Sequence, residues 1–334
     1  MYGILQGSIL GPILFLIYIN DLHLVSKSLT LMFADDTFGL KSDKDIITLI
    51  NEINKDINKM VIWFRSNKLA VNINKTKYII FKSKGKKINN VLPPVIYNEN
   101  EPGKPYDHDK VTVLERYHDK HNNANCRAYK LLGVYLDEHL TLDYHVSHLS
   151  KKLTRSLYCI KMAKNNLNPS GMRSLYFALI HSHLGYCPTI LNCLSTANKN
   201  KLFKLQKKAI RVVTGSAYNA HTSPLFIQYK ILPLEKVIKQ GMLMFMHAVN
   251  YEYAPKSFIN TWLKNNARNN DRVLRNDDDF IIPIPRIDFF KRTPFYALPH
   301  LWNNSGNLKF YDNKITFKRV LREQLFEELM EIEN

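Results

Sequence analysis

The sequence predicts an α+β protein in which short antiparallel strands near the amino terminus precede a mostly helical remainder. Two short apolar runs flank an Asp-Asp pair at positions 35 and 36, which is typical of a β-hairpin. Apolar residues recur at helical spacing over 46–64 and again from residue 146 onward. The 334 residues are enough for two or three domains, each with its own core.

The first hairpin is expected to carry the sequence Phe33-Ala34-Asp35-Asp36 at its tip. Adjacent ionised carboxylates repel each other, so the pair is stable where it is exposed or neutralised by a cation. Hard divalent ions such as Mg²⁺ prefer one or two carboxylates together with phosphate oxygens. Asp35 and Asp36 are therefore candidates for half of a two-metal phosphoryl-transfer site. The dipeptide alone is equally compatible with an ordinary polar turn.

A glycine-containing loop and an apolar segment precede this hairpin. Gly7 and Gly11 permit a tight loop, and Pro12 suits the first turn of a helix, where its missing N–H costs nothing. Residues 13–22 are apolar on nearly every face, which predicts a helix buried in a core. This segment is shorter than the roughly 20 residues that a membrane span requires.

These segments together resemble the palm of reverse transcriptases encoded by non-LTR retrotransposons. The resemblance rests on the loop Gln6-Gly7-Ser8-Ile9-Leu10-Gly11-Pro12 and on the Phe33-Ala34-Asp35-Asp36 hairpin at about the family's spacing. It implies RNA-directed DNA polymerisation with Mg²⁺ (or Mn²⁺), an RNA template, a DNA primer and dNTP. It also implies that Asp35 and Asp36 bind the metal ions and that Gln6, Gly7 and Ser8 border the template and the nascent base pair.

The resemblance continues beyond the hairpin. Residues 42–65 are expected to form a helix packed on the sheet. The family's next motif is matched by Trp63, Asn67, Leu69, Asn72, Lys75 and Thr76. By this resemblance Lys75 is a general acid near the leaving pyrophosphate. The alternative is a solvated lysine at the start of a strand.

A second hairpin is expected over residues 129–137, which resemble the family's primer grip. Leu132, Gly133 and Val134 would contact the primer end, and Gly133 would let the backbone approach the sugar-phosphate chain. Residues 82–127 are polar and have little periodicity, which predicts a surface insertion. Residues 1–136 are thus expected to be a partial palm.

The sequence begins a few residues before Gln6. The family's polymerases have an earlier strand with another metal-binding Asp, and fingers that close over the nucleotide. We therefore expect a carboxy-terminal fragment that is inactive alone. The alternative is a non-catalytic nucleic-acid-binding remnant of a decayed element.

The formal net charge is +18 and the pI is near 9.6. No Asp or Glu occurs between Tyr144 and Leu234, whereas thirteen Lys and Arg residues do. Such one-sided charge indicates a polyanionic partner, whose phosphates supply affinity without sequence information. An acidic lipid surface is the competing partner, but these helices are expected to lack the exposed aromatic face of interfacial anchors.

Three helices are predicted in this basic region, which corresponds to a thumb over residues 137–215. The first carries an apolar stripe from Val146 to Ile160, and the second follows Asn168. The third runs from about Ala197 to Thr214. Its expected buried face is Leu202, Leu205, Ala209 and Val212, and its expected nucleic-acid face is Lys201, Lys204, Lys208 and Arg211. A merely solvated face is the alternative.

The remaining residues, 216–334, are expected to form a helical extension that packs on the thumb.

The four cysteines, Cys126, Cys159, Cys187 and Cys193, are expected to be free thiols. No secretory signal is recognisable, so we expect a reducing intracellular compartment, the nucleus or the cytoplasm. A zinc site formed by His181, His183, Cys187 and Cys193 is a weaker alternative, because His183 falls on an apolar helical stripe. The sequence does not predict an oligomeric state.

Overall fold

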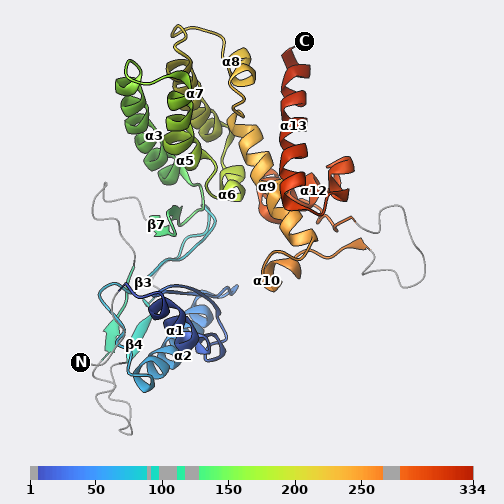
Figure 1. Cartoon of the computed structure of the whole chain (residues 1–334). Helices are drawn as coiled ribbons and strands as arrows, with labels where there is room; N and C mark the ends of the chain where they lie inside the picture. The colour runs from blue at the N-terminus through green and yellow to red at the C-terminus, as the bar shows by residue number, and fades with distance from the viewer. Residues whose placement is uncertain (1–6, 89–91, 98–110, 117–127, 266–278, 334) are drawn as a thin grey trace. The chain divides into compact units, whose positions relative to one another are not determined.

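A computed structural model describes residues 7–88, 92–97, 111–116, 128–265 and 279–333 (Figure 1). The chain divides into two compact units, Met1–Leu140 and Thr141–Asn334. Strands and helices are both present in the first unit, and helices dominate the second. The predicted α+β class is therefore confirmed. The domain limits expected at 136/137 and 215/216 remain predictions.

The first unit contains two α-helices, one short 3-10 helix and eight short strands among its described residues. Its helical elements are α1 (Leu10–Ile19), η1 (Leu22–Leu24) and α2 (Ile46–Ser66). Its strands are β1 (Leu29–Phe33), β2 (Asp36–Leu40), β3 (Lys77–Tyr78), β4 (Val95–Tyr97), β5 (Val111–Val113), β6 (Glu115–Arg116), β7 (Ala128–Leu131) and β8 (Val134–Asp137).

The strands form separate pairs. The β1–β2, β4–β5 and β7–β8 pairs are antiparallel, and β3–β6 is parallel. Both predicted hairpins are thus present at the expected residues. The single antiparallel sheet expected for the palm is not found among the described residues, where every sheet has two strands.

Part of the predicted surface insertion belongs to the core of the first unit. Ile96 and Leu114 are buried and pack with Val61 of α2. The backbone N–H of Val95 also donates to Asn54 Oδ1 on α2, at 2.9 Å. The sequence did not predict these apolar contacts, because residues 82–127 are mostly polar. Residues 89–91, 98–110 and 117–127 of the insertion lie outside the described part of the chain.

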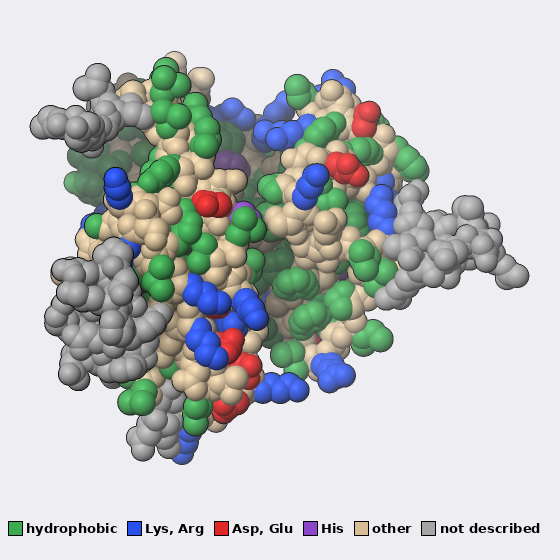
Figure 2. Space-filling model, turned by 90° about the horizontal axis from the view of Figure 1, so that it is seen from below, with side chains coloured by type: hydrophobic (Ala, Val, Ile, Leu, Met, Phe, Trp, Pro, Cys, Tyr) green, Lys and Arg blue, Asp and Glu red, His purple; other side chains and the backbone are tan. Residues whose placement is uncertain are grey.

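The expectation that the first apolar helix is buried is wrong for this chain. In α1 only Ile19 is buried, and Leu10, Ile13, Leu14, Leu16, Ile17 and Tyr18 are exposed. Ile17 alone exposes 68% of its surface. The described residues do not cover this apolar face, and other apolar side chains are widely exposed on the side of the molecule drawn in Figure 2. A contiguous apolar surface of this kind is typical of an interaction site.

The second unit is helical. Its principal helices are α3 (Asp143–Ala163), α4 (Pro169–Tyr176), a π-helical turn η2 (Phe177–His181), α5 (Ser182–Leu184), α6 (Pro188–Cys193), α7 (Thr196–Thr214) and α8 (Ser223–Gln228). They are followed by α9 (Leu234–Asn250), α10 (Lys256–Ile259), α11 (Asp288–Arg292), α12 (Pro294–Asn303), the 3-10 helix η4 (Gly306–Phe310) and α13 (Lys314–Glu333). Helix α7 packs on α3, α4, α8 and α9. Figure 1 shows α7 beside α3.

Local signals set the ends of these helices. Asn168 and Ser195 cap α4 and α7 by accepting hydrogen bonds from the backbone N–H groups of Gly171 (2.8 Å) and Asn198 (3.3 Å). Helix α7 ends at Gly215, whose φ of 71° lies in the left-handed region that glycine adopts readily. The three predicted helices therefore have the predicted limits to within a few residues.

The buried face of α7 differs from the predicted one. Its buried residues are Leu202, Gln206, Ala209, Ile210 and Val213, whereas Leu205 and Val212 are only half-buried. The amide of Gln206 donates to Tyr176 Oη and to the carbonyl oxygen of Leu232, both at 2.9 Å. Its oxygen accepts the backbone N–H of Leu234 at 2.8 Å. This amide therefore joins α7, α4 and the start of α9.

Replacing Gln206 by Met should lower the free energy of unfolding of the helical unit by about 2–4 kcal/mol. The substitution keeps the side-chain volume but leaves buried backbone and hydroxyl groups without their partner. Urea unfolding followed by circular dichroism measures the effect. The neighbouring, half-buried Leu205→Met is the matched control, because a leucine side chain has no polar atom to lose. Equal stability of the two variants would contradict this role for Gln206.

Candidate active site and nucleic-acid interface

The β1–β2 hairpin presents the two aspartates at its turn. Phe33 pairs with Asp36, so Ala34 and Asp35 form a two-residue turn. Ala34 has a φ of 51°, in the left-handed region that short hairpin turns require. Both Asp35 and Asp36 are exposed. Within the described part of the chain, neither carboxylate has a hydrogen bond or an ion pair, so their oxygens are available to a cation.

The base of this hairpin is fixed to α2 by the buried carboxylate of Asp56. Ser28, just before β1, donates its hydroxyl to Asp56 Oδ2 at 2.6 Å, and the backbone N–H of Lys27 donates to Oδ1 at 3.3 Å. Lys41, just after β2, places its Nζ 3.3 Å from Oδ2 and 3.2 Å from Glu52 Oε2. One side chain thus holds both ends of the hairpin. Asp56 was not predictable from the sequence, because a lone acid on a helix resembles a surface residue.

The hydrogen bonds to Asp56 outweigh the cost of burying it. Burial, which leaves only 4% of the residue exposed, raises the pKa of this carboxyl. The donors Ser28, Lys27 and Lys41 act in the opposite direction, and the resulting pKa of Asp56 lies below its ordinary value. The ionised form is therefore the one that the fold favours.

The two predicted hairpins lie next to each other. The rings of Phe38 on β2 and Tyr129 on β7 are 6.2 Å apart in an edge-to-face arrangement. Burial raises the pKa of the Tyr129 hydroxyl, and the nearby charge of Asp36 raises it further. The carboxylate turn and the predicted primer-grip hairpin are thus neighbours within the first unit, which the sequence spacing alone did not establish.

The turn of the second hairpin consists of Leu132 and Gly133. Both have positive φ, 45° and 88°, as a two-residue turn of this type requires. Val134 begins β8 and is buried. Leu132 therefore holds an unusual conformation for a branched residue. The hairpin predicted for the primer grip is confirmed as a hairpin, and its contact with primer remains a prediction.

The upstream loop is described only from Gly7 onward, so Gln6 lies outside the described residues. Gly7 has a φ of 90°, which supports the predicted need for glycine there. Ser8 Oγ accepts the backbone N–H of Gly11 at 3.1 Å at the start of α1. Ser8 thus has a structural role in addition to the predicted one.

The motif around Lys75 forms a compact turn. Asn67 ends α2 and donates its side-chain amide to the carbonyl oxygen of Trp63 at 2.9 Å. Asn72 accepts the backbone N–H of Lys75 on its side chain and the hydroxyl of Thr76 on its carbonyl oxygen. The two asparagines and the threonine therefore shape the backbone. Lys75 itself is exposed.

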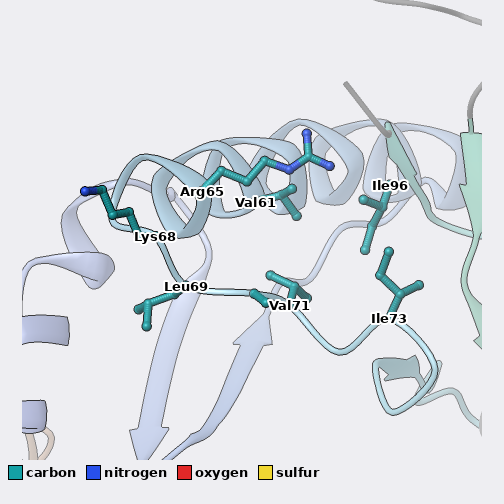
Figure 3. A pocket seen from close by; sticks show the side chains of 8 residues that line it. Val61, Arg65, Lys68, Leu69, Val71, Ile73 and Ile96 are labelled. Carbon is teal, nitrogen blue, oxygen red and sulfur yellow. The ribbon is translucent and has the colours of Figure 1, made fainter. Parts of the chain in front are cut away.

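A cavity of about 410 Å³ lies between α2 and the segment that leads to this turn. Val61 and Ile96 lie across from Val71 and Ile73 (Figure 3). Arg65 and Lys68 are the charged residues in its lining. Because the remaining lining side chains are apolar, the cavity is unsuited to the triphosphate of a nucleotide.

Metal binding at the turn requires ligands in addition to Asp35 and Asp36. Over the described ranges, no group of three or more His, Cys, Asp or Glu side chains could hold a metal ion. Exposed carboxylate oxygens without partners suit a hard divalent cation that keeps waters and phosphates among its ligands. The two aspartates therefore fit as part of a site.

The zinc alternative has no support in the described region. Cys193 Sγ lies 3.4 Å from the carbonyl oxygens of Thr189 and Arg292. The thiol thus donates a hydrogen bond to the backbone and is not placed as a metal ligand. Burial raises the pKa of the Cys187 and Cys193 thiols and so disfavours the thiolates that zinc binds. Cys159, Cys187 and Cys193 are free thiols, as predicted. Cys126 lies outside the described residues.

Helix α7 presents three of its four predicted basic residues to solvent. Lys201, Lys204 and Lys208 are exposed, and in the part of the chain that is described they form no ion pair. Arg211 is half-buried and donates its Nε–H to the carbonyl oxygen of Ala220 at 2.9 Å. Its guanidinium thus also holds the loop after α7, and its predicted contact with nucleic acid remains a prediction.

Helix α3, packed against α7, adds further exposed cations. Lys151, Lys152, Arg155 and Lys161 are exposed on it. Tyr158 and Met162 are exposed on the same helix, at 64% and 62%. Tyr158 is thus an exposed aromatic residue among the cations of α3, and one ring does not make the aromatic face of an interfacial anchor. Nucleic-acid surfaces commonly interleave aromatic and basic side chains.

Within the described ranges, none of the helices combines the length and the apolar composition that crossing a membrane would require.

Comparisons with known proteins relate the chain to retrotransposon polymerases. It is 24% identical over 240 residues to a probable RNA-directed DNA polymerase from the Drosophila melanogaster transposon X-element, covering 69% of this chain and 23% of that protein. It is 22% identical over 260 residues to the RNA-directed DNA polymerase from the D. melanogaster mobile element jockey, covering 74% and 26%. A probable polymerase from transposon BS is 23% identical over 71% of this chain and 25% of its own length.

The comparisons confirm the predicted resemblance: over about 70% of its length the chain is similar to RNA-directed DNA polymerases of non-LTR retrotransposons. The chain spans about a quarter of the length of these relatives. No family model matches it. No solved structure matches it.

Replacing Asp56 by Asn should loosen the β1–β2 hairpin and destabilise the first unit by about 1–3 kcal/mol at neutral pH. The substitution keeps the shape but removes charge-assisted hydrogen bonds to both ends of the hairpin. Hydrogen exchange of β1 and β2 amides measures the loosening. The exposed Asp21→Asn is the control, and equal protection in both variants would contradict the anchoring role.

The contribution of Asp56 should also depend on pH. Its folded pKa lies below its unfolded value of about 3.9, so the stabilisation is fully present above that value and disappears as the pH falls through the folded pKa. Unfolding measured from pH 7 down to pH 2 should therefore show a smaller loss of stability in Asp56→Asn than in the unchanged chain.

Proposed function

We propose that residues 1–136 form part of the palm of a reverse transcriptase and that the basic helices of residues 137–215 are its nucleic-acid-binding thumb, followed by a helical extension over 216–334. The observation that carries the proposal is the contact between two hairpins. The hairpin that carries the exposed Asp-Asp turn contacts the hairpin that carries the Leu-Gly turn through the rings of Phe38 and Tyr129. The relatives are named as RNA-directed DNA polymerases, which supports this reading.

In the proposed reaction, the 3′-hydroxyl of a DNA primer attacks the α-phosphate of a dNTP on an RNA template. Asp35, with Asp36 in a secondary role, holds divalent metal ions, Mg²⁺ or Mn²⁺, together with a further carboxylate. When bound, such ions activate the hydroxyl and stabilise negative charge on the phosphate oxygens. Lys75 gives a proton to the leaving pyrophosphate, since it is exposed beside a turn that Asn72 fixes.

Other residues position the substrates. Gln6, Gly7 and Ser8 border the template and the nascent base pair. The backbone of Leu132, Gly133 and Val134 contacts the primer end, where the positive φ of Gly133 leaves room for a sugar-phosphate chain. Lys201, Lys204 and Lys208 contact backbone phosphates of the RNA–DNA duplex.

We further propose that this chain alone binds nucleic acid without transferring nucleotides. The described residues include no cluster of three metal-ligating side chains, and two-metal transfer needs ligands beyond one turn. The second candidate function, a non-catalytic nucleic-acid-binding protein, is favoured by the same observation and by the exposed basic face of α7.

A chimera distinguishes the two functions. In it, this chain replaces the matching segment of the jockey polymerase, and primer extension on an RNA template is measured. Extension should fall by about 10³-fold or more in Asp35→Asn, because a ligand of the reacting ions is lost. Asp36→Asn should have a smaller effect, and Asp21→Asn should have none. Retention of activity in Asp35→Asn would contradict the catalytic assignment, and an inert parent chimera would favour the non-catalytic function.

Replacing Lys201, Lys204 and Lys208 by Gln should weaken binding of an RNA–DNA hybrid and flatten its salt dependence. Each phosphate contact contributes roughly 0.9 to the log–log salt slope of B-DNA, so two or three lost contacts should lower the slope by about 2 to 3. Preference between hybrid sequences should not change, because phosphate contacts carry no base information. Arg211 is left intact because it holds the loop through Ala220.

A matched triple variant controls for net charge in this measurement. Lys256, Arg286 and Lys314 are exposed cations of the same unit that lie outside α7. Replacing them by Gln removes the same charge and should change the slope by less than about 1. Equal effects of the two triple variants, with circular dichroism unchanged, would mean that α7 is a solvated face.

A further inference from the structure

A second group of cations converges in the helical unit, away from the residues considered so far. Arg173 lies on α4 and Arg322 on α13, and the two bind consecutive peptide units just after α8. Arg173 Nε donates to the carbonyl oxygen of Tyr229 at 3.1 Å, and Arg322 Nη2 donates to that of Lys230 at 2.7 Å. Both side chains are half-buried.

Aromatic rings also hold the two guanidinium groups in place. Arg173 lies over the ring of Phe177, 4.8 Å from its centroid, and Arg322 lies over that of Phe326, at 5.4 Å. A guanidinium fixed by a carbonyl and a ring retains free N–H donors, because it has five and the carbonyl takes one. The two planar guanidinium groups are thus ordered before an anion binds, which lowers the entropic cost of binding it.

No carboxylate compensates this positive charge. In the part of the chain that is described, neither guanidinium forms an ion pair. Because they bind adjacent carbonyl groups, the two cations lie near each other. Burial lowers the pKa of Arg322, and the charge of Arg173 lowers it further. Like charges held together without a counter-charge cost free energy that a bound anion would recover.

Two more basic side chains face the same region. Lys318 precedes Arg322 by one turn of α13 and is exposed. His181 Nδ1, at the end of η2, is buried and has no hydrogen-bond partner within the described residues. The ring of His181 lies 5.0 Å from that of Phe177, over which Arg173 lies. Burial lowers the pKa of His181, and the charges of Arg322 and Lys318 act in the same direction.

Capping α8 does not account for the arrangement. A carbonyl oxygen needs one neutral donor, and a single serine or asparagine would supply it. Here two arginines, from helices about 150 residues apart in sequence, donate hydrogen bonds to adjacent carbonyl oxygens. Their positive charges repel each other, which costs free energy. Paired, pre-ordered forks are typical of phosphate recognition.

We propose that Arg173 and Arg322, assisted by Lys318, form a phosphate-binding site that receives a backbone phosphate of nucleic acid. The site extends the nucleic-acid surface proposed above and rests on that proposed function, but it uses different helices from the lysines of α7. It gives the carboxy-terminal helix α13 a contact with the bound strand.

The test measures binding of a short single-stranded RNA and of an RNA–DNA hybrid by fluorescence anisotropy at several salt concentrations, with the full chain. The double variant Arg173→Gln and Arg322→Gln should lose about tenfold in affinity for at least one of these probes. The salt slope should fall by about 1.8 for the hybrid or about 1.4 for the single strand, as expected for two lost phosphate contacts. Lys314→Gln with Arg319→Gln, which removes the same charge from exposed positions of α13, should change affinity by less than about twofold.

A second double variant, with conservative substitutions, distinguishes an effect on nucleic-acid binding from an effect on folding. Arg173→Lys with Arg322→Lys keeps the charge and one donor for each carbonyl but loses the fork, so thermal stability should be largely retained while affinity still falls by about threefold or more. Unchanged affinity in the Lys pair, with loss in the Gln pair only in proportion to unfolded protein, would overturn the proposal and leave a structural role.

The outcome is distinguishable from that of the α7 proposal. If the α7 triple variant binds normally while the Arg173 and Arg322 variants bind weakly, the α7 assignment fails and this site stands. Inorganic phosphate is tested separately as a thermal stabiliser against chloride at equal ionic strength. Stabilisation that depends on both arginines, with unchanged binding of both nucleic-acid probes, would overturn the assignment to a nucleic-acid phosphate.

Discussion

The helical unit depends on one buried amide. Gln206 uses both of its polar atoms to connect α7 to Tyr176 of α4 and to the backbone at Leu232 and Leu234. A buried polar group that is fully satisfied fixes one arrangement of the surrounding helices, whereas a partly satisfied one costs stability. Burial raises the pKa of the Tyr176 hydroxyl, which therefore remains a neutral partner of the amide. The orientation of the basic face of α7 follows from this connection.

The first unit uses the same principle with a charged group. Asp56 is buried, ionised and bound to both ends of the β1–β2 hairpin. The orientation of the exposed Asp35 and Asp36 therefore depends on Asp56, although they do not contact it. Each unit thus has an internal polar anchor behind an exposed charged surface. The surface residues determine what can bind, and the anchors determine where those residues point.

Local signals in the sequence were sufficient for the hairpins and for most helix limits. Asp35 and Gly133 stand at turns because short turns leave few conformations, and Gly215 ends α7 for the same reason. Features that depend on distant partners were not predictable. Gln206 and Asp56 are polar residues on helices, and only the packed structure reveals that they are buried. Likewise, Arg211 matched the expected spacing of a basic stripe, but its loop contact was not visible in the sequence.

The exposed apolar face of α1 affects how the isolated chain behaves in concentrated solution. A net charge of +18 keeps copies of the chain apart at low ionic strength. The Debye length falls from about 30 Å at 0.01 M salt to about 10 Å at 0.1 M, and apolar faces of different copies then meet at little electrostatic cost. Added salt therefore favours self-association of this chain while it weakens contacts to polyanions. The colloidal state of the protein and its affinity for polyanions are thus coupled through one variable, the ionic strength.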